Sequence, residues 1–199
     1  EHVHGEDLRS IVRQMKKQGV LEFPLEHALA IVLGMCSGLA YAHDKRDLDN
    51  SHLGIVHRDI SPQNVVVTFT GDVKFVDFGI AKSDSRGGFE QTKSGKLKGK
   101  VEYMSPEQAR GEPEVGPAAD IFSLGCVIYQ CLSGKPPFRA GNAAAALAKI
   151  LLETPRPIQD VRKGIPEVIA DLLGRMLAKD AARRPADASE LLAELSGIG

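Results

Sequence analysis

Three side chains that carry carboxylate or amide oxygens, Asp59, Asn64 and Asp77, stand around two short β-branched segments. Pairing of these segments as a hairpin would return the chain and bring Asn64 and Asp77 to the same end. Such oxygens are ligands that Mg²⁺ accepts. Asp59 precedes Asn64 by five residues and could face the same centre without binding the metal. An acid in that position can orient a hydroxyl group and accept its proton as phosphate is transferred.

The elements that must position these residues can be read from the pattern of apolar and turn residues. The hairpin is predicted over 65–68 and 73–76, with Thr70-Gly71-Asp72 between its strands. Apolar spacing predicts helices over 5–17, 24–43 and 121–132. Three more helices are predicted nearer the C-terminus from the residues that begin them: Asn142 as a cap, Pro166 as a first residue, and Asp187 with Glu190 in capping-box spacing. The stretch 83–100 has no apolar periodicity, which is typical of a functional or mobile connection. The fold class expected is mainly α with a small β-hairpin region.

The composition fits an ordinary globular protein: 199 residues, 43% hydrophobic, 26% charged, with a formal net charge of -1. We therefore expect no nucleic-acid partner and no membrane segment within this chain. Cys36, Cys126 and Cys131 lie in apolar stretches without a CxxC pair, which predicts buried structural thiols and a reducing, cytoplasmic location. The chain begins with Glu1 rather than Met, and we expect a fragment or a processed product.

A longer motif surrounds the three oxygen-bearing residues. Residues 57–64 read H-R-D-I-S-P-Q-N and residues 77–79 read D-F-G, which matches the H-R-D-x-x-x-x-N and D-F-G pattern of protein kinases. Residues 103–107, Y-M-S-P-E, resemble the segment that closes the kinase activation loop. Asp120 resembles the aspartate of the family's helix F, and Arg184 resembles the late arginine that pairs with the Glu at the position of Glu107.

The whole chain thus resembles the C-terminal lobe of a bacterial eukaryotic-like Ser/Thr protein kinase. The resemblance implies a hinge remnant over 1–8 and the lobe over 9–199, with the catalytic loop at 57–64 and the activation segment at 77–107. It implies an α+β kinase fold that lacks its N-terminal lobe, because no Gly-rich loop, strand lysine or partner glutamate precedes Glu1. We expect the parent chain to supply that lobe, and the fragment alone to be inactive.

The activity implied is transfer of the ATP γ-phosphate to a Ser or Thr hydroxyl of a protein substrate. Asp59 would orient the hydroxyl, and Asn64 and Asp77 would hold Mg²⁺ on the nucleotide phosphates. Two alternatives stay open: a pseudokinase, and a protein-interaction module of the same fold without catalysis. A small-molecule kinase of similar fold is disfavoured by residues 103–107, which build the peptide platform in protein kinases.

The resemblance also assigns nucleotide contacts to the first residues of the chain. The Glu1 carbonyl and the Val3 backbone would meet adenine, and Asp7 would lie near the ribose.

Two positions depart from the family pattern. Ser61 stands where Ser/Thr kinases usually carry a lysine, and Lys100 follows Gly99 where they usually carry a threonine. In the family these positions approach each other beside the catalytic aspartate. Our hypothesis is an exchange, in which the Lys100 ammonium replaces the missing lysine and the Ser61 hydroxyl replaces the threonine. The alternative is that Lys100 is one more solvated lysine in a basic stretch.

Arg58 precedes the predicted catalytic acid. In the family such an arginine often pairs with a phosphorylated activation-loop residue, and here Thr92 and Ser94 are the candidates. The alternative is that Arg58 pairs only with a local acid or carbonyl group.

Overall fold

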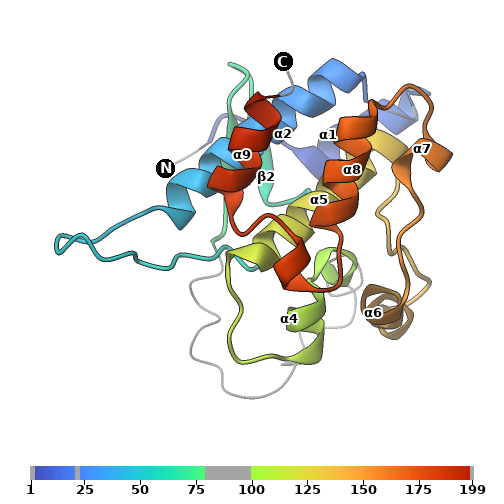
Figure 1. Cartoon of the computed structure of the whole chain (residues 1–199). Helices are drawn as coiled ribbons and strands as arrows, with labels where there is room; N and C mark the ends of the chain where they lie inside the picture. Colours follow the sequence, from blue (N-terminus) through green and yellow to red (C-terminus); the bar gives the residue numbers. More distant parts are fainter. Residues whose placement is uncertain (1–2, 21–22, 79–99, 198–199) are drawn as a thin grey trace.

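The computed structural model describes residues 3–20, 23–78 and 100–197 of the chain (Figure 1). Within these ranges the fold is rich in helix and has one three-stranded antiparallel sheet. The elements are β1 (Gly5–Asp7), α1 (Leu8–Lys17), α2 (Leu25–His43), β2 (Val65–Thr68), β3 (Val73–Phe75), η2 (Val101–Tyr103), α4 (Pro106–Arg110), α5 (Pro117–Ser133), α6 (Ala143–Leu152), α7 (Ile158–Val161), α8 (Glu167–Met176), η3 (Ala181–Arg183) and α9 (Ala188–Ser196).

The sheet contains the predicted hairpin and one strand that the sequence did not predict. β2 pairs with β3, and β1 pairs with the other edge of β2. The helix predicted over 5–17 was wrong at its start, because residues 5–7 form β1. Gly5 permits this close pairing, since a Cβ atom there would lie 2.4 Å from the Val67 carbonyl oxygen.

α1 begins at Leu8 because Asp7 caps it. One carboxylate oxygen of Asp7 accepts from the Ser10 backbone N–H at 2.9 Å, and the other accepts from the Ser10 hydroxyl at 2.7 Å. A capping aspartate satisfies a free N–H of the first turn. Both oxygens are therefore committed within the first turn of the helix.

α5 is the central helix of the fold (Figure 1). Every residue from Ala119 to Tyr129 is buried, which confirms the prediction of a helix that is covered on all sides. It extends beyond the predicted bounds, to Pro117 and Ser133, and Gly134 ends it in the left-handed conformation at φ 75°.

α2 is a second core helix. Its length and apolar composition alone would allow it to cross a bilayer. It packs instead against β3, α5 and α9, and Met35, Cys36 and Leu39 on its inner face are fully buried. The burial of this face accounts for its apolar composition.

The three cysteines are buried and free. Burial raises the pKa of the Cys36 and Cys131 thiols to about 12 and also raises that of Cys126. The thiols therefore stay protonated and serve as apolar packing groups, as predicted.

The chain between α2 and the motif at residues 57–64 forms a projecting loop (Figure 1). Arg46 and His52 form an isolated antiparallel bridge in it. Asp47 closes its tip by accepting hydrogen bonds from the backbone N–H groups of Asp49 and Ser51 at 2.9 and 3.0 Å.

Candidate active site

Asp120, in the first turn of α5, holds the backbone of the 57–64 loop. Its carboxylate accepts from the N–H of His57 at 2.7 Å and from the N–H of Arg58 at 2.8 Å. Arg58 has a left-handed backbone with φ 61°, a conformation that costs free energy in a non-glycine residue. The two hydrogen bonds from a fully buried carboxylate stabilise that strained turn.

His43, the last residue of α2, orients Asp120. Its Nδ1 accepts from the Ala188 backbone N–H at 3.3 Å, so its Nε2 carries the proton and donates to Asp120 at 3.1 Å. From the sequence, His43 was predicted only as the end of a helix. The one signal that could have found it is a titratable residue on the apolar face of that helix.

His57 joins the loop to the end of β3. Its Nδ1 accepts from the Asp59 N–H and its Nε2 donates to the Val76 carbonyl, both at 3.3 Å. Its ring also contacts Phe78, with the ring centroids 4.5 Å apart. Burial lowers the pKa of His57. This effect is larger than the increase in pKa that the nearby carboxylates of Asp120 and Asp59 cause. The neutral imidazole is therefore the form that fits both hydrogen bonds.

This burial predicts an acid-sensitive contribution to stability. Unfolded His57 binds a proton near its ordinary pKa of 6.5, whereas the folded residue does so only at lower pH. The stabilisation is therefore complete above about pH 6.5 and is lost as the pH falls through the folded value. Denaturant unfolding at pH 7.5 and 5.5 should show a smaller pH-dependent loss for His57→Phe than for the wild type. Equal losses would contradict the assignment.

The three residues singled out by their chemistry come from segments that the structure brings together. Asn64 donates from Nδ2 to the Asp59 carbonyl at 2.8 Å, which turns its Oδ1 away from that contact. The Val76 N–H donates to the Asn64 carbonyl at 3.0 Å. Asp77, the next residue, therefore begins beside Asn64. Asp77 has a left-handed backbone with φ 57° and an exposed side chain. Asn64 and the residue before Asp77 are thus paired at the same end of the hairpin.

Lys100 contacts the predicted catalytic acid directly. Its Nζ donates to Asp59 Oδ2 at 2.5 Å, with the lysine side chain 39% and the aspartate side chain 16% exposed. Ser61 is buried, and its Oγ has no hydrogen-bond partner among the described residues. The contact of Lys100 with Asp59 therefore agrees with the hypothesis that Lys100 replaces the missing lysine. The Ser61 hydroxyl, in contrast, has no hydrogen bond to Asp59 or Lys100 among the described residues.

The segment after Lys100 rests on the catalytic loop. Ser105 caps α4 and forms a capping box with Gln108, and the Gln108 side chain donates to the Arg58 carbonyl at 2.8 Å. The role of Gln108 was not predicted from the sequence, because its partner lies 50 residues earlier in the chain.

Arg184 and Glu107 form a buried ion pair beneath this segment. Two guanidinium nitrogens of Arg184 donate to the Glu107 carboxylate at 2.8 and 3.0 Å. Burial alone would raise the pKa of Glu107, but the hydrogen bonds and charge of Arg184 bring it below its ordinary value. The pair therefore stays ionised and ties α4 to the chain between η3 and α9.

The predicted nucleotide contacts at the start of the chain are only partly described. Glu1 lies outside the described residues, and Val3 is half-buried. Asp7 is the cap of α1, with both carboxylate oxygens accepting from Ser10.

The candidate phosphorylation sites Thr92 and Ser94 lie outside the described residues. Arg58, their predicted partner, has a buried Nε without a hydrogen bond in the part of the chain that the structure describes.

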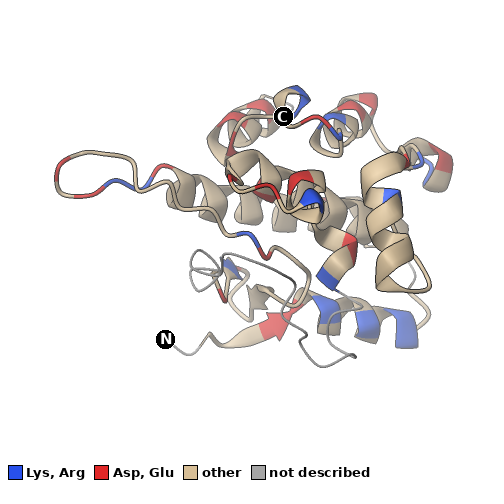
Figure 2. Cartoon of the chain, turned by 90° about the horizontal axis from the view of Figure 1, so that it is seen from below, with Lys and Arg blue, Asp and Glu red and all other residues tan. Residues whose placement is uncertain are grey.

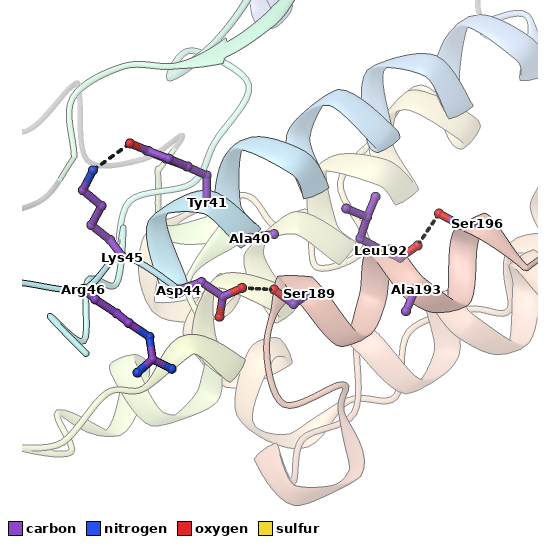
Figure 3. Close-up of a pocket in the computed structure, with 9 residues that line it drawn as sticks. All are labelled: Ala40, Tyr41, Asp44, Lys45, Arg46, Ser189, Leu192, Ala193 and Ser196. Carbon is purple, nitrogen blue, oxygen red and sulfur yellow. Dashed lines mark hydrogen bonds between the residues drawn. The ribbon is translucent and has the colours of Figure 1, made fainter. Parts of the chain in front are cut away.

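A separate hollow lies between the end of α2 and α9 (Figure 3). Its lining residues are Ala40, Tyr41, Asp44, Lys45, Arg46, Ser189, Leu192, Ala193 and Ser196. Lys45 donates to the Tyr41 hydroxyl, and the Ser189 hydroxyl donates to Asp44, both at 2.7 Å. No predicted site residue lines this hollow, so the candidate site remains the cluster around Asp59.

The chain is similar to known proteins over nearly its whole length. A family model described as Protein kinase domain matches residues 1–195. Tyrosine-protein kinase MasK of Myxococcus xanthus is 40% identical over 207 residues, which cover 100% of this chain and 31% of that protein.

Proteins named as Ser/Thr kinases are also similar. The probable serine/threonine-protein kinase PknB of Bifidobacterium longum is 35% identical, over 98% of this chain and 26% of that protein. Serine/threonine-protein kinase PknB of Mycobacterium tuberculosis is 32% identical, over 98% of this chain and 29% of that protein. The chain thus spans about a third or less of the length of these relatives.

Proposed function

Since this chain belongs to the protein kinase domain family, we propose that the natural protein that carries it transfers the γ-phosphoryl group of ATP to a Ser or Thr hydroxyl of a protein substrate. The observation that carries this proposal is a hydrogen-bond network that joins Asp59 to Asn64 and reaches Val76, the residue before Asp77. Asn64 bonds the Asp59 carbonyl, and His57 bonds both the Asp59 N–H and the residue before Asp77.

The three oxygen-bearing residues have different roles in the proposed reaction. Asp59 would accept a hydrogen bond from the substrate hydroxyl and orient its oxygen for in-line attack. Asn64 and Asp77 would hold Mg²⁺ with their side-chain oxygens. The ion, when bound, supplies positive charge to the β- and γ-phosphate oxygens. Among the described residues no group of three or more His, Cys, Asp or Glu is placed to hold a metal, so nucleotide and water oxygens would complete the coordination.

The proposal includes parts of the protein outside this chain. Residues 9–199 would be the C-terminal lobe and residues 1–8 the hinge, with the adenine contacts at Glu1 and Val3. Since Asp7 already caps α1, a ribose contact by its carboxylate would add to those hydrogen bonds. An N-terminal lobe in the full-length protein would cover the nucleotide.

Lys100 is proposed as the cation beside the transferring phosphate. Its ammonium contacts the carboxylate of Asp59, and its side chain is more than one third exposed, so it can also face a negatively charged group. A fixed cation stabilises charge that develops on the phosphoryl group. This would replace the lysine that the family carries at the position of Ser61.

Replacing Lys100 by Met should therefore lower kcat by about a hundredfold, the scale of losing one such stabilising group. Steady-state phosphate transfer by the full-length protein measures the loss. Lys98→Met removes the same charge from the same stretch and should have a small effect. Ser61→Ala should also be nearly neutral, because the Ser61 hydroxyl has no described partner. Equal small losses for Lys100→Met and Lys98→Met would identify Lys100 as a solvated lysine.

The activity itself is tested with the full-length natural protein, Mg²⁺ and γ-labelled ATP. Matched peptides that differ only in a central Ser, Thr or Tyr serve as acceptors. Label on the Ser and Thr peptides is expected. Label confined to the Tyr peptide would favour the second candidate, a tyrosine kinase, which the similarity to MasK supports. Binding of Mg·ATP without any transfer would favour the pseudokinase alternative.

A further inference from the structure

α1 carries a strongly basic face to which the proposed reaction assigns no role. Arg9, Arg13, Lys16 and Lys17 are all exposed, and the helix has no acidic residue. Residues four apart share one face of a helix, so Arg9, Arg13 and Lys17 form a continuous row. In Figure 2 the helix that follows the red-tipped N-terminal strand carries blue segments and no red ones. This concentration of charge contrasts with the net charge of -1 for the whole chain.

The row begins at the catalytic loop. The Arg9 N–H donates to the Pro62 carbonyl at 3.0 Å, and the Arg9 guanidinium donates to the Gln63 side chain at 3.1 Å. Gln63 lies between Asp59 and Asn64 in the chain. Arg13 follows Arg9 by one helical turn, about 6 Å along the axis. The basic row therefore starts at the loop that carries Asp59, three residues after it at Pro62 and four after it at Gln63.

α1 is held rigidly against the rest of the fold. Leu8 and Val12 on its inner face are buried, and at its far end Lys16 donates to the Gly134 carbonyl at 2.6 Å. The outward face thus presents cations and no large apolar side chain that would insert into a membrane. Guanidinium groups bind carboxylates with two parallel hydrogen bonds, and one bond to Gln63 leaves further Arg9 donors available.

We propose that the basic face of α1, defined as Arg9, Arg13, Lys16 and Lys17, selects protein acceptors that carry Asp or Glu residues near the phosphorylated hydroxyl. The inference rests on the proposed kinase function and adds the chemical class of the substrate. It assigns these residues to substrate recognition.

The test uses the full-length protein and two acceptor peptides that differ only in charge. One has a central Ser with Glu residues on both sides, and the other has Gln in their place. The ratio of the two kcat/KM values is the readout, so a loss common to both peptides does not change it. At low ionic strength the wild type should prefer the Glu peptide by about tenfold, and 0.5 M salt should reduce this preference because it screens exposed charges.

Arg13→Gln/Lys17→Gln should bring the ratio close to one, while Arg9 is left to hold the catalytic loop. The matched control is Lys163→Gln/Arg183→Gln, which removes two exposed cations that lie outside α1 and the catalytic loop and should keep the wild-type ratio. A wild-type ratio near one would overturn the proposal. So would an unchanged ratio in the α1 variant, or an equal change in the control.

A binding measurement separates this proposal from the kinase function. Fluorescence anisotropy of a labelled Glu peptide reports on the α1 face whether or not phosphate is transferred. Weaker binding by the α1 variant than by the control variant supports the proposal even if the kinase assay fails. Equal binding overturns it, as does an α1 variant that loses binding to anionic lipid vesicles while it keeps binding to the peptide.

Discussion

Replacing Asp59 by Asn should lower kcat for phosphate transfer by about a thousandfold, within the range that general-base groups contribute. The amide keeps the size of the side chain but cannot take the hydroxyl proton, and it loses the ionic contact with Lys100. The Asp59 N–H and carbonyl, which bond His57 and Asn64, are unchanged. Affinity for Mg·ATP should therefore stay within about threefold. Single-turnover transfer and nucleotide titration on the full-length protein measure the two quantities.

Asp72→Asn is the matched control for this variant. Asp72 lies in the exposed turn between β2 and β3, where its carboxylate accepts from Thr70 at 3.0 Å. The same chemical change there should leave kcat unaltered. An Asp59→Asn protein that kept more than a tenth of the wild-type kcat would exclude the assigned role. Loss of nucleotide affinity together with kcat would instead indicate damage to the whole site.

The second large effect is on stability. Arg184→Met should lower the free energy of unfolding by about 3–5 kcal/mol, the scale for breaking a buried ion pair. Arg184 is buried and donates to the Glu107 carboxylate and to the carbonyls of Ala118, Ala178 and Lys179. Methionine fills a similar volume but leaves Glu107 charged without its partner. Chemical denaturation should show the loss, with a fall in Tm of roughly 10 °C.

Arg175→Met is the matched control for the stability experiment. Arg175 also forms a two-pronged pair, with Glu194, but its side chain is 47% exposed. Exposed pairs contribute about 0–1 kcal/mol, so this variant should unfold close to the wild-type midpoint. Similar losses for the two variants would show that burial does not set the strength of the Arg184 pair.

Much of the fold was predictable because its signals are local. The hairpin, the buried helix α5 and the caps at Asn142 and Asp187 depend on residues within one turn or one strand of each other, and the structure has all of them. β1 was missed for the opposite reason. Three residues are too few to show a period, and they form a strand only because β2 offers them a free edge.

In the candidate site, too, residues close together in the sequence were predictable and contacts between distant segments were not. The spacing of Asp59, Asn64 and Asp77 predicted one common centre, since one hairpin connects two of them and a short loop connects the third. The structure has Asn64 bonded to the Asp59 carbonyl and to the backbone of Val76, the residue before Asp77. The contact of Lys100 with Asp59, 41 residues away, was hypothesised only from the family resemblance, and the contact of His43 with Asp120, 77 residues away, was not predicted. No local pattern encodes a contact over such a separation.

The sequence alone therefore determined which chemical groups this protein has and which of them are close neighbours along the chain. Only the tertiary structure decided between a solvated Lys100 and one that contacts Asp59, showed that His43 orients Asp120, and placed the basic face of α1 beside Gln63. The physical reason is that these contacts form when α1, α2 and α5 bury their apolar faces. Packing of those faces sets the relative positions of the helices, and the polar residues at their ends and on their outer faces are carried into place with them.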